Sequence, residues 1–113
     1  MEKNYKLDKI EELAGGDEEF IASIAEAFLE EVPEAILLMK EGLVNKNFKQ
    51  VYQNAHKIKP TVEMFGLPIY QEVIVLQDWG KFEQLGTDVI NEYNKISELV
   101  SKVVAELKSD FNL

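Results

Sequence analysis

Apolar residues recur at spacings of three and four along most of this chain, and this pattern constrains the fold more than any other feature. Residues at such spacings share one face of an α-helix. Similar stripes occur within residues 20–43 and 89–107. Amphipathic helices bury their apolar faces against one another, so the pattern predicts an all-α fold. The clearest stripe consists of Phe48, Val51, Ala55, Ile58, Val62 and Phe65.

Glycine, proline and asparagine mark where the predicted helices begin, bend and end. A short leading helix should stop at Gly15-Gly16, after which Asp17 can cap the second helix. Pro33 should kink that second helix or divide it. The Asn45-Lys46-Asn47 segment favours a turn. Gly66 is in the usual position to end the third helix.

The segment that follows Gly66 allows two interpretations. Four consecutive apolar residues, Val73-Ile74-Val75-Leu76, are compatible with a buried strand. No other segment offers a strand partner, so we expect a helix over residues 68–79 and a loop over residues 80–86. Short connections between amphipathic helices are typical of bundles. The sequence therefore predicts one domain, residues 1–113, that folds as an antiparallel four-helix bundle with a short extra N-terminal helix.

Charge and composition exclude several classes of function. The net charge is −9, which disfavours binding to nucleic acid or to an anionic membrane surface. The chain has no cysteine and one histidine, so thiolate sites and multi-histidine zinc sites are excluded. No apolar run approaches the roughly 20 residues of a membrane span, and the N-terminus lacks the apolar stretch of a signal peptide. We expect a soluble, cytoplasmic, monomeric protein.

The single histidine lies in a locally basic region of this acidic chain. Residues 40–59 contain five lysines and one acid. If the apolar stripe is buried, His56 points outward and Lys59 lies one turn further along the same face. Imidazole accepts phosphoryl groups because a neutral ring nitrogen is available near pH 7. A nearby cation can stabilise the charge on the transferring oxygens.

These residues resemble the signature of histidine-containing phosphotransfer (HPt) domains, which are modules of two-component phosphorelays. The family pattern has a histidine, a lysine three residues later and a glycine ten residues after the histidine. The chain matches it at His56, Lys59 and Gly66, with a frequent preceding alanine at Ala55. Residues 15–33 also resemble the first bundle helix of the family.

The resemblance implies a role for each matched residue. His56 would accept the phosphoryl group and Lys59 would stabilise it. Lys57 is not part of the family pattern, and its position about 100° round the helix predicts that it mainly steers the partner. The partners would be receiver domains of response regulators, including the receiver of a hybrid histidine kinase. The protein would need no cofactor of its own, because Mg²⁺ would come with the receiver. The expected binding surface around the histidine comprises Lys49, Tyr52, Lys57, Pro60, Glu63 and Gly66.

Pro60 departs from the family pattern, which usually has glycine at this position. Proline cannot donate to the carbonyl of His56 and its ring clashes with it, so we expect a kinked but continuous helix. This departure motivates an alternative function: an HPt-like bundle that binds receivers without accepting phosphate. A hydrolase with His56 as base is disfavoured, since no serine, cysteine or carboxylate lies within a turn of it. We expect a phosphocarrier without catalytic turnover of its own.

Overall fold

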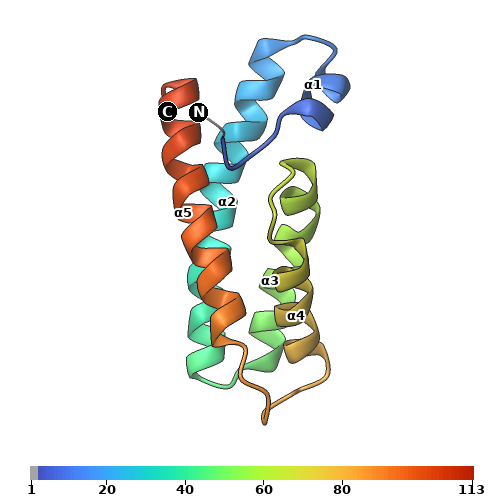
Figure 1. Ribbon diagram of the computed structural model, residues 1–113, viewed down its shortest axis with the longest axis vertical. Coiled ribbons are helices and arrows are strands. Elements are labelled where there is room, and N and C mark those ends of the chain that lie inside the picture. The colour runs from blue at the N-terminus through green and yellow to red at the C-terminus, as the bar shows by residue number, and fades with distance from the viewer. Residues whose placement is uncertain (1–2) are drawn as a thin grey trace.

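Five helices and no strand make up residues 3–113, the part of the chain that this computed structural model describes. In Figure 1, α2 and α4 run downward, whereas α3 and α5 run upward, so the four long helices are antiparallel. The short helix α1 lies at the upper end of the bundle. The helices are α1 (Asp8–Ala14), α2 (Glu18–Val44), α3 (Phe48–Met64), α4 (Tyr70–Lys81) and α5 (Ile90–Phe111).

Each long helix packs against two others, because α2 contacts α3 and α5, and α4 contacts α3 and α5. The result is a rod of about 46 × 23 × 21 Å. All buried side chains within residues 3–113 are apolar, and they form one continuous core. The predicted antiparallel bundle with an extra N-terminal helix is confirmed. No helix in this part of the chain is long and apolar enough to cross a membrane.

The end of α1, the start of α2 and the end of α3 form where the sequence places them. The Asp17 side chain accepts hydrogen bonds from the backbone N–H groups of Glu19 and Phe20 at 3.1 and 3.2 Å, which caps α2. Gly15 ends α1 with φ of +60°, and Gly66 follows α3 with φ of +61°. This left-handed conformation favours glycine because it has no Cβ.

Both internal prolines lie within unbroken helices. The second helix runs through Pro33 for 27 residues, so it is not divided there, and the other expectation, a kink at Pro33, stays a prediction. The third helix likewise continues through Pro60 to Met64. Val62 and Phe65, beyond Pro60, are almost completely buried. Losing their contacts would cost several kcal/mol, compared with about 3 kcal/mol for a helical proline. The continuity of α3 is confirmed, and the kink at Pro60 stays a prediction.

The fourth helix is shifted relative to the expectation. It spans Tyr70–Lys81 instead of residues 68–79, so the prediction that Gly80 and Lys81 belong to a loop is wrong. Gly80 is buried in the helix, where α4 lies close to α3. The apolar run from Val73 to Leu76 is helical, as expected.

Phe20, in the stripe predicted within residues 20–43, and Leu13 in α1 do not follow the apolar pattern of burial. Their side chains are exposed although their spacing fits the buried faces. Both residues lie near the turn between α1 and α2 at one end of the rod, where fewer helices surround them.

The residues before α1 tie two long helices together. The backbone N–H of Lys6 donates to the carbonyl of Phe65 at 2.7 Å, and the ring of Tyr5 packs edge-on against the Phe65 ring. The Tyr5 hydroxyl donates to Asp110 near the end of α5. Lys3 forms an ion pair with the same carboxylate at 3.1 Å. We call residues 3–6 with their contacts to α3 and α5 the N-terminal clasp.

Candidate functional site

His56 lies near the middle of α3, on the side facing away from the core. Its neighbours Ala55, Ile58 and Val62 are buried, whereas the imidazole is exposed. The apolar residues fix the rotation of the helix, and this rotation leaves His56 in solvent. The predicted exposure of His56 is confirmed.

A close approach between two helices positions the surroundings of the histidine. A Cβ atom at Gly80 would lie 2.5 Å from the Phe48 carbonyl oxygen and 2.7 Å from the Tyr52 nitrogen. Only glycine permits this proximity between α4 and the backbone of α3. Because the two helices are antiparallel, the residue one turn before Gly80 on α4 lies beside the residue one turn after Tyr52 on α3. These two positions are occupied by Gln77 and His56.

The His56 ring contacts one side chain from each of these helices. Its Nδ1 lies 3.3 Å from Oε1 of Gln77. The Tyr52 ring stacks on the imidazole, with centroids 5.7 Å apart and planes at 16°. An amide oxygen only accepts hydrogen bonds, so this contact favours the tautomer with the proton on Nδ1. The lone pair is then on Nε2, which is the nitrogen able to attack an electrophile.

Three lysines surround the histidine at different positions on the helix. Lys59 is one turn beyond His56 and is half-buried, so its stem lies along the protein surface. Lys57 is adjacent in sequence and exposed, about 100° further round the helix. Lys49 precedes His56 by two turns and is also exposed. Lys49 and Lys59 place positive charge near the His56 face and Lys57 adds it at the side, in a protein whose net charge is −9.

The remaining predicted site residues lie further from the imidazole. Pro60 and Glu63 are exposed on α3, and Glu63 is two turns, or about 10 Å, from His56. Gly66 is beyond the end of α3, about 15 Å along the axis from His56. A Cβ at Gly66 would lie 3.1 Å from the Cβ of Lys6, so the clasp passes close to this exposed glycine. The structure therefore groups Tyr52 with His56 and places Gly66 at the helix end.

Gln77 is the site residue that the sequence analysis missed. Its helix was predicted, but nothing in the periodicity of α4 indicates which residue faces His56. The available signal was Gly80, a glycine inside an otherwise helical pattern, which can mark a close helix–helix contact. The sequence pattern instead predicts a loop at Gly80, so this signal does not lead to Gln77.

No group of three His, Asp or Glu side chains within residues 3–113 could hold a metal ion. The chain matches no protein-family model, curated protein or solved structure at a significant level. The candidate site is therefore defined by its own geometry: an exposed imidazole, an amide oxygen at Nδ1 and flanking lysines.

Proposed function

We propose that the protein is a phosphorelay carrier in which His56 accepts a phosphoryl group from a receiver-domain aspartate and passes it to another receiver. The contact between His56 Nδ1 and Gln77 Oε1 is the observation that carries the proposal. It leaves Nε2 as an exposed nucleophile without removing the imidazole from solvent.

The transfer step needs little from the protein beyond position and charge. Nε2 attacks the phosphorus of an aspartyl phosphate, and the N–P bond forms as the P–O bond to the aspartyl oxygen breaks. The carboxylate leaves with the electron pair of that bond, and the proton on Nδ1 remains in contact with Gln77. In the phosphorylated protein, Lys59 offsets the added negative charge.

The exposed α3 face suits a partner with an acidic pocket. Lys49, Lys57 and Lys59 lie on or beside the His56 face. Opposite charge on a receiver would steer the encounter and increase the association rate. Tyr52 beside the imidazole provides an apolar surface with a polar tip, a combination that is common at interfaces.

Transfer from an isolated receiver tests the proposal directly. A receiver domain is phosphorylated on its aspartate with a small acyl phosphate and Mg²⁺, separated from excess donor, and mixed with this protein. We expect acid-labile, alkali-stable label on His56, as for phosphohistidine, and no label on the His56→Gln variant. A His56→Gln variant that is labelled equally would contradict the assignment. Binding to receivers without labelling of the wild type would support the adaptor alternative.

The roles of the two lysines can be separated by salt. Lys59→Ala should slow transfer about tenfold at all salt concentrations, which corresponds to about 1.4 kcal/mol of barrier. Lys57→Ala is the matched control, and it should mainly lower the association rate at low salt. Equal behaviour of both variants across salt concentrations would show that Lys59 has no specific role.

The tautomer can be read directly because His56 is the only histidine in the chain. In ¹⁵N spectra at neutral pH, Nδ1 should carry the proton in the wild type. Gln77→Leu removes the acceptor and should shift the population toward the Nε2-protonated form, and transfer should slow. Gln53→Leu, on the exposed surface of α3, is the control that changes neither the tautomer nor the rate.

A further inference from the structure

Exposed large apolar side chains are concentrated at the end of the bundle opposite α1. This end is formed by the α2–α3 turn with its flanks, residues 41–49, and by the end of α4 with the following loop, residues 80–90. We call these two segments the turn end. Four of the nine exposed large apolar side chains within residues 3–113 lie in it: Val44, Phe82, Leu85 and Ile90. Exposed apolar side chains that lie together can mark an interaction surface.

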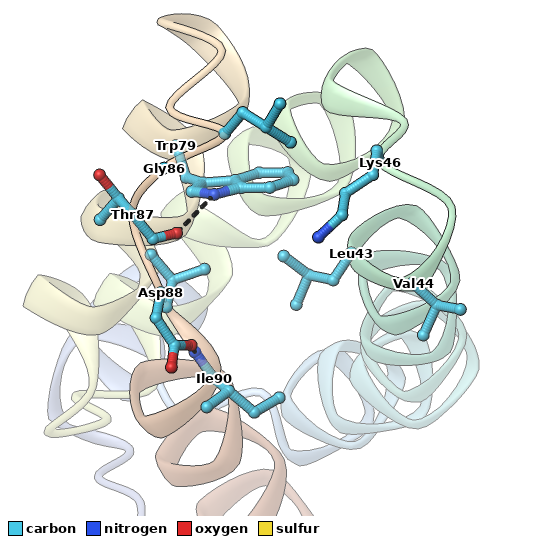
Figure 2. Close-up of a pocket in the computed structure, with 10 residues that line it drawn as sticks. Leu43, Val44, Lys46, Trp79, Gly86, Thr87, Asp88 and Ile90 are labelled. Atoms are coloured by element: carbon cyan, nitrogen blue, oxygen red, sulfur yellow. Dashed lines mark hydrogen bonds between the residues drawn. The ribbon is translucent and has the colours of Figure 1, made fainter.

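A groove of about 340 Å³ lies between the two segments. Figure 2 shows Val44 and Lys46 on one side of it, and Asp88 and Ile90 on the opposite side. Trp79 forms part of the lining, and its indole N–H donates to the Thr87 carbonyl at 3.1 Å. This hydrogen bond ties the loop to α4, so the groove exists before any partner binds.

Charge does not oppose self-association at the turn end. Residues 8–34 contain ten acids and one lysine, so two copies would repel each other there. The turn end contains three lysines and three acids. Its charges in the groove are of opposite sign and lie on opposite sides, with Lys46 across from Asp88.

We infer that the turn end binds the turn end of a second copy of this chain, forming a two-fold symmetric dimer. A two-fold axis that lies in the end face and crosses the Lys46–Asp88 line at right angles places each lysine opposite the aspartate of the other copy. The same rotation places Val44 opposite Ile90. Such an isologous contact is closed, so it ends at two copies. This inference departs from the monomer expected from the sequence, and it does not depend on the proposed phosphotransfer.

The size of the end face limits the strength of this dimer. Its cross-section of about 23 × 21 Å allows roughly 1,000 Å² of buried surface over both copies. That area is at the lower limit for specific interfaces, so we expect a dissociation constant on the order of 100 μM. His56 lies about 12 Å along α3 from Phe48 at the turn end, so it stays accessible in the dimer.

Sedimentation velocity over protein concentrations from about 10 μM to 1 mM tests the inference. The mean mass of the wild type should rise from that of one chain toward that of two. Leu85→Glu would place two carboxylates in the interface and should weaken association at least tenfold. Leu37→Glu is the matched control: Leu37 is similarly exposed, at 69% against 60%, but belongs to the groove between α2 and α5.

A charge exchange tests the pairing itself. The Lys46→Glu chain carries two acids in the groove and the Asp88→Lys chain carries two lysines, so each alone should associate less than the wild type. An equimolar mixture should recover association, because both pairs are then of opposite sign. Asp88 also accepts a hydrogen bond from the Ile90 N–H at 3.0 Å, so circular dichroism must first show that Asp88→Lys folds. If Asp88→Lys does not fold, Asp88→Asn replaces it. The association of Asp88→Asn and of Lys46→Glu is then compared with that of the wild type, and the mixture is omitted.

A wild-type protein that stays monomeric at 1 mM would overturn the inference, even if the turn end binds some other protein. A dimer that Leu37→Glu disrupts and Leu85→Glu does not would also overturn it, because it would place the interface between α2 and α5.

Discussion

At one end of the bundle the N-terminal clasp joins α3 to α5, whereas at the other end the α2–α3 turn and the α4–α5 loop stand apart around a groove. At the clasped end, Tyr5 is buried and its hydroxyl is satisfied by Asp110. At the turn end, Val44 and Leu85 are each at least 60% exposed. The comparison shows that the chain joins two helices at one end with its own N-terminal residues and leaves a groove lined by apolar side chains open at the other.

His56 lies between these two ends, and both influence its helix. The turn end contributes the close packing of Gly80 on α3, which places Gln77 beside the imidazole. The clasp holds the other end of α3 through the Phe65 carbonyl. Substitutions at each end should therefore distinguish residues that stabilise the fold from residues that mediate an interaction with another molecule.

The largest effect is expected at the clasped end, for Tyr5→Ala. This change removes a ring that is 7% exposed and packs against Phe65, together with the hydrogen bond to Asp110. Truncating a buried aromatic side chain typically costs about 3–5 kcal/mol, so we expect a loss near 3 kcal/mol in the free energy of unfolding. Urea denaturation measures it. Tyr5→Phe keeps the ring and should lose only about 1 kcal/mol; equal losses would mean that the hydroxyl, not packing, closes this end.

A smaller loss is expected for Gly80→Ala, at the start of the turn end. The new methyl would collide with the backbone of α3, so α4 must move away, at a cost of about 2 kcal/mol. The displacement should also lengthen the contact between Gln77 and His56 and change the His56 ¹⁵N shifts. Gly86→Ala is the matched control, since nothing lies within 4 Å of a Cβ there. Similar unfolding midpoints for both variants would contradict the close-approach argument.

Alkaline pH should weaken the clasp selectively. Burial, and then the hydrogen bond to Asp110, raise the pKa of Tyr5 above its ordinary value of 10.0. Because the folded-state pKa is the higher one, the stabilisation is fully present below pH 10 and is lost as pH rises above it. Wild-type unfolding free energy should therefore fall above pH 10 more steeply than that of Tyr5→Phe. Burial also raises the pKa of Tyr93, so both proteins share a common decline and the difference between them is the measurement.

The clasp should also contribute less to stability at acidic pH. Hydrogen bonds from Tyr5 and then Lys3 hold the pKa of Asp110 below its ordinary value of 3.8. A depressed folded-state pKa stabilises the protein above that value and stops doing so as pH falls below it. Asp110→Asn should reduce the acid-induced part of the stability loss below pH 3.8, and an unchanged acid profile would show that the carboxylate contributes nothing.

The smallest effect is expected for Leu85→Glu at the turn end. The side chain is 60% exposed, so its replacement should change the free energy of unfolding by no more than about 0.5 kcal/mol in dilute solution. The measurement is urea denaturation at a protein concentration well below that needed for association. A large loss would show that Leu85 belongs to the core, and its effect on association would then need another variant, such as Val44→Glu.

Local physical chemistry in the sequence determined the helices and the direction of His56. The spacing of residues such as Val51, Ala55 and Ile58 dictates which face of α3 is buried, and glycine at positions 15 and 66 ends helices because it tolerates positive φ. Asp17 caps α2 for a similarly local reason. The exposure of His56 and Lys57 follows from the same periodicity.

Only the tertiary structure decided which helices pack against each other and in what register along their axes. Gln77 meets His56 because Gly80 lets α4 approach α3 closely, and the pairing joins residues 21 positions apart. Tyr5 meets Asp110 across 105 positions, and Lys46 lies across a groove from Asp88. Helical periodicity reports how each residue is oriented around its own axis and contains no information on the register between axes. That register is set by which side chains interdigitate once all helices pack together.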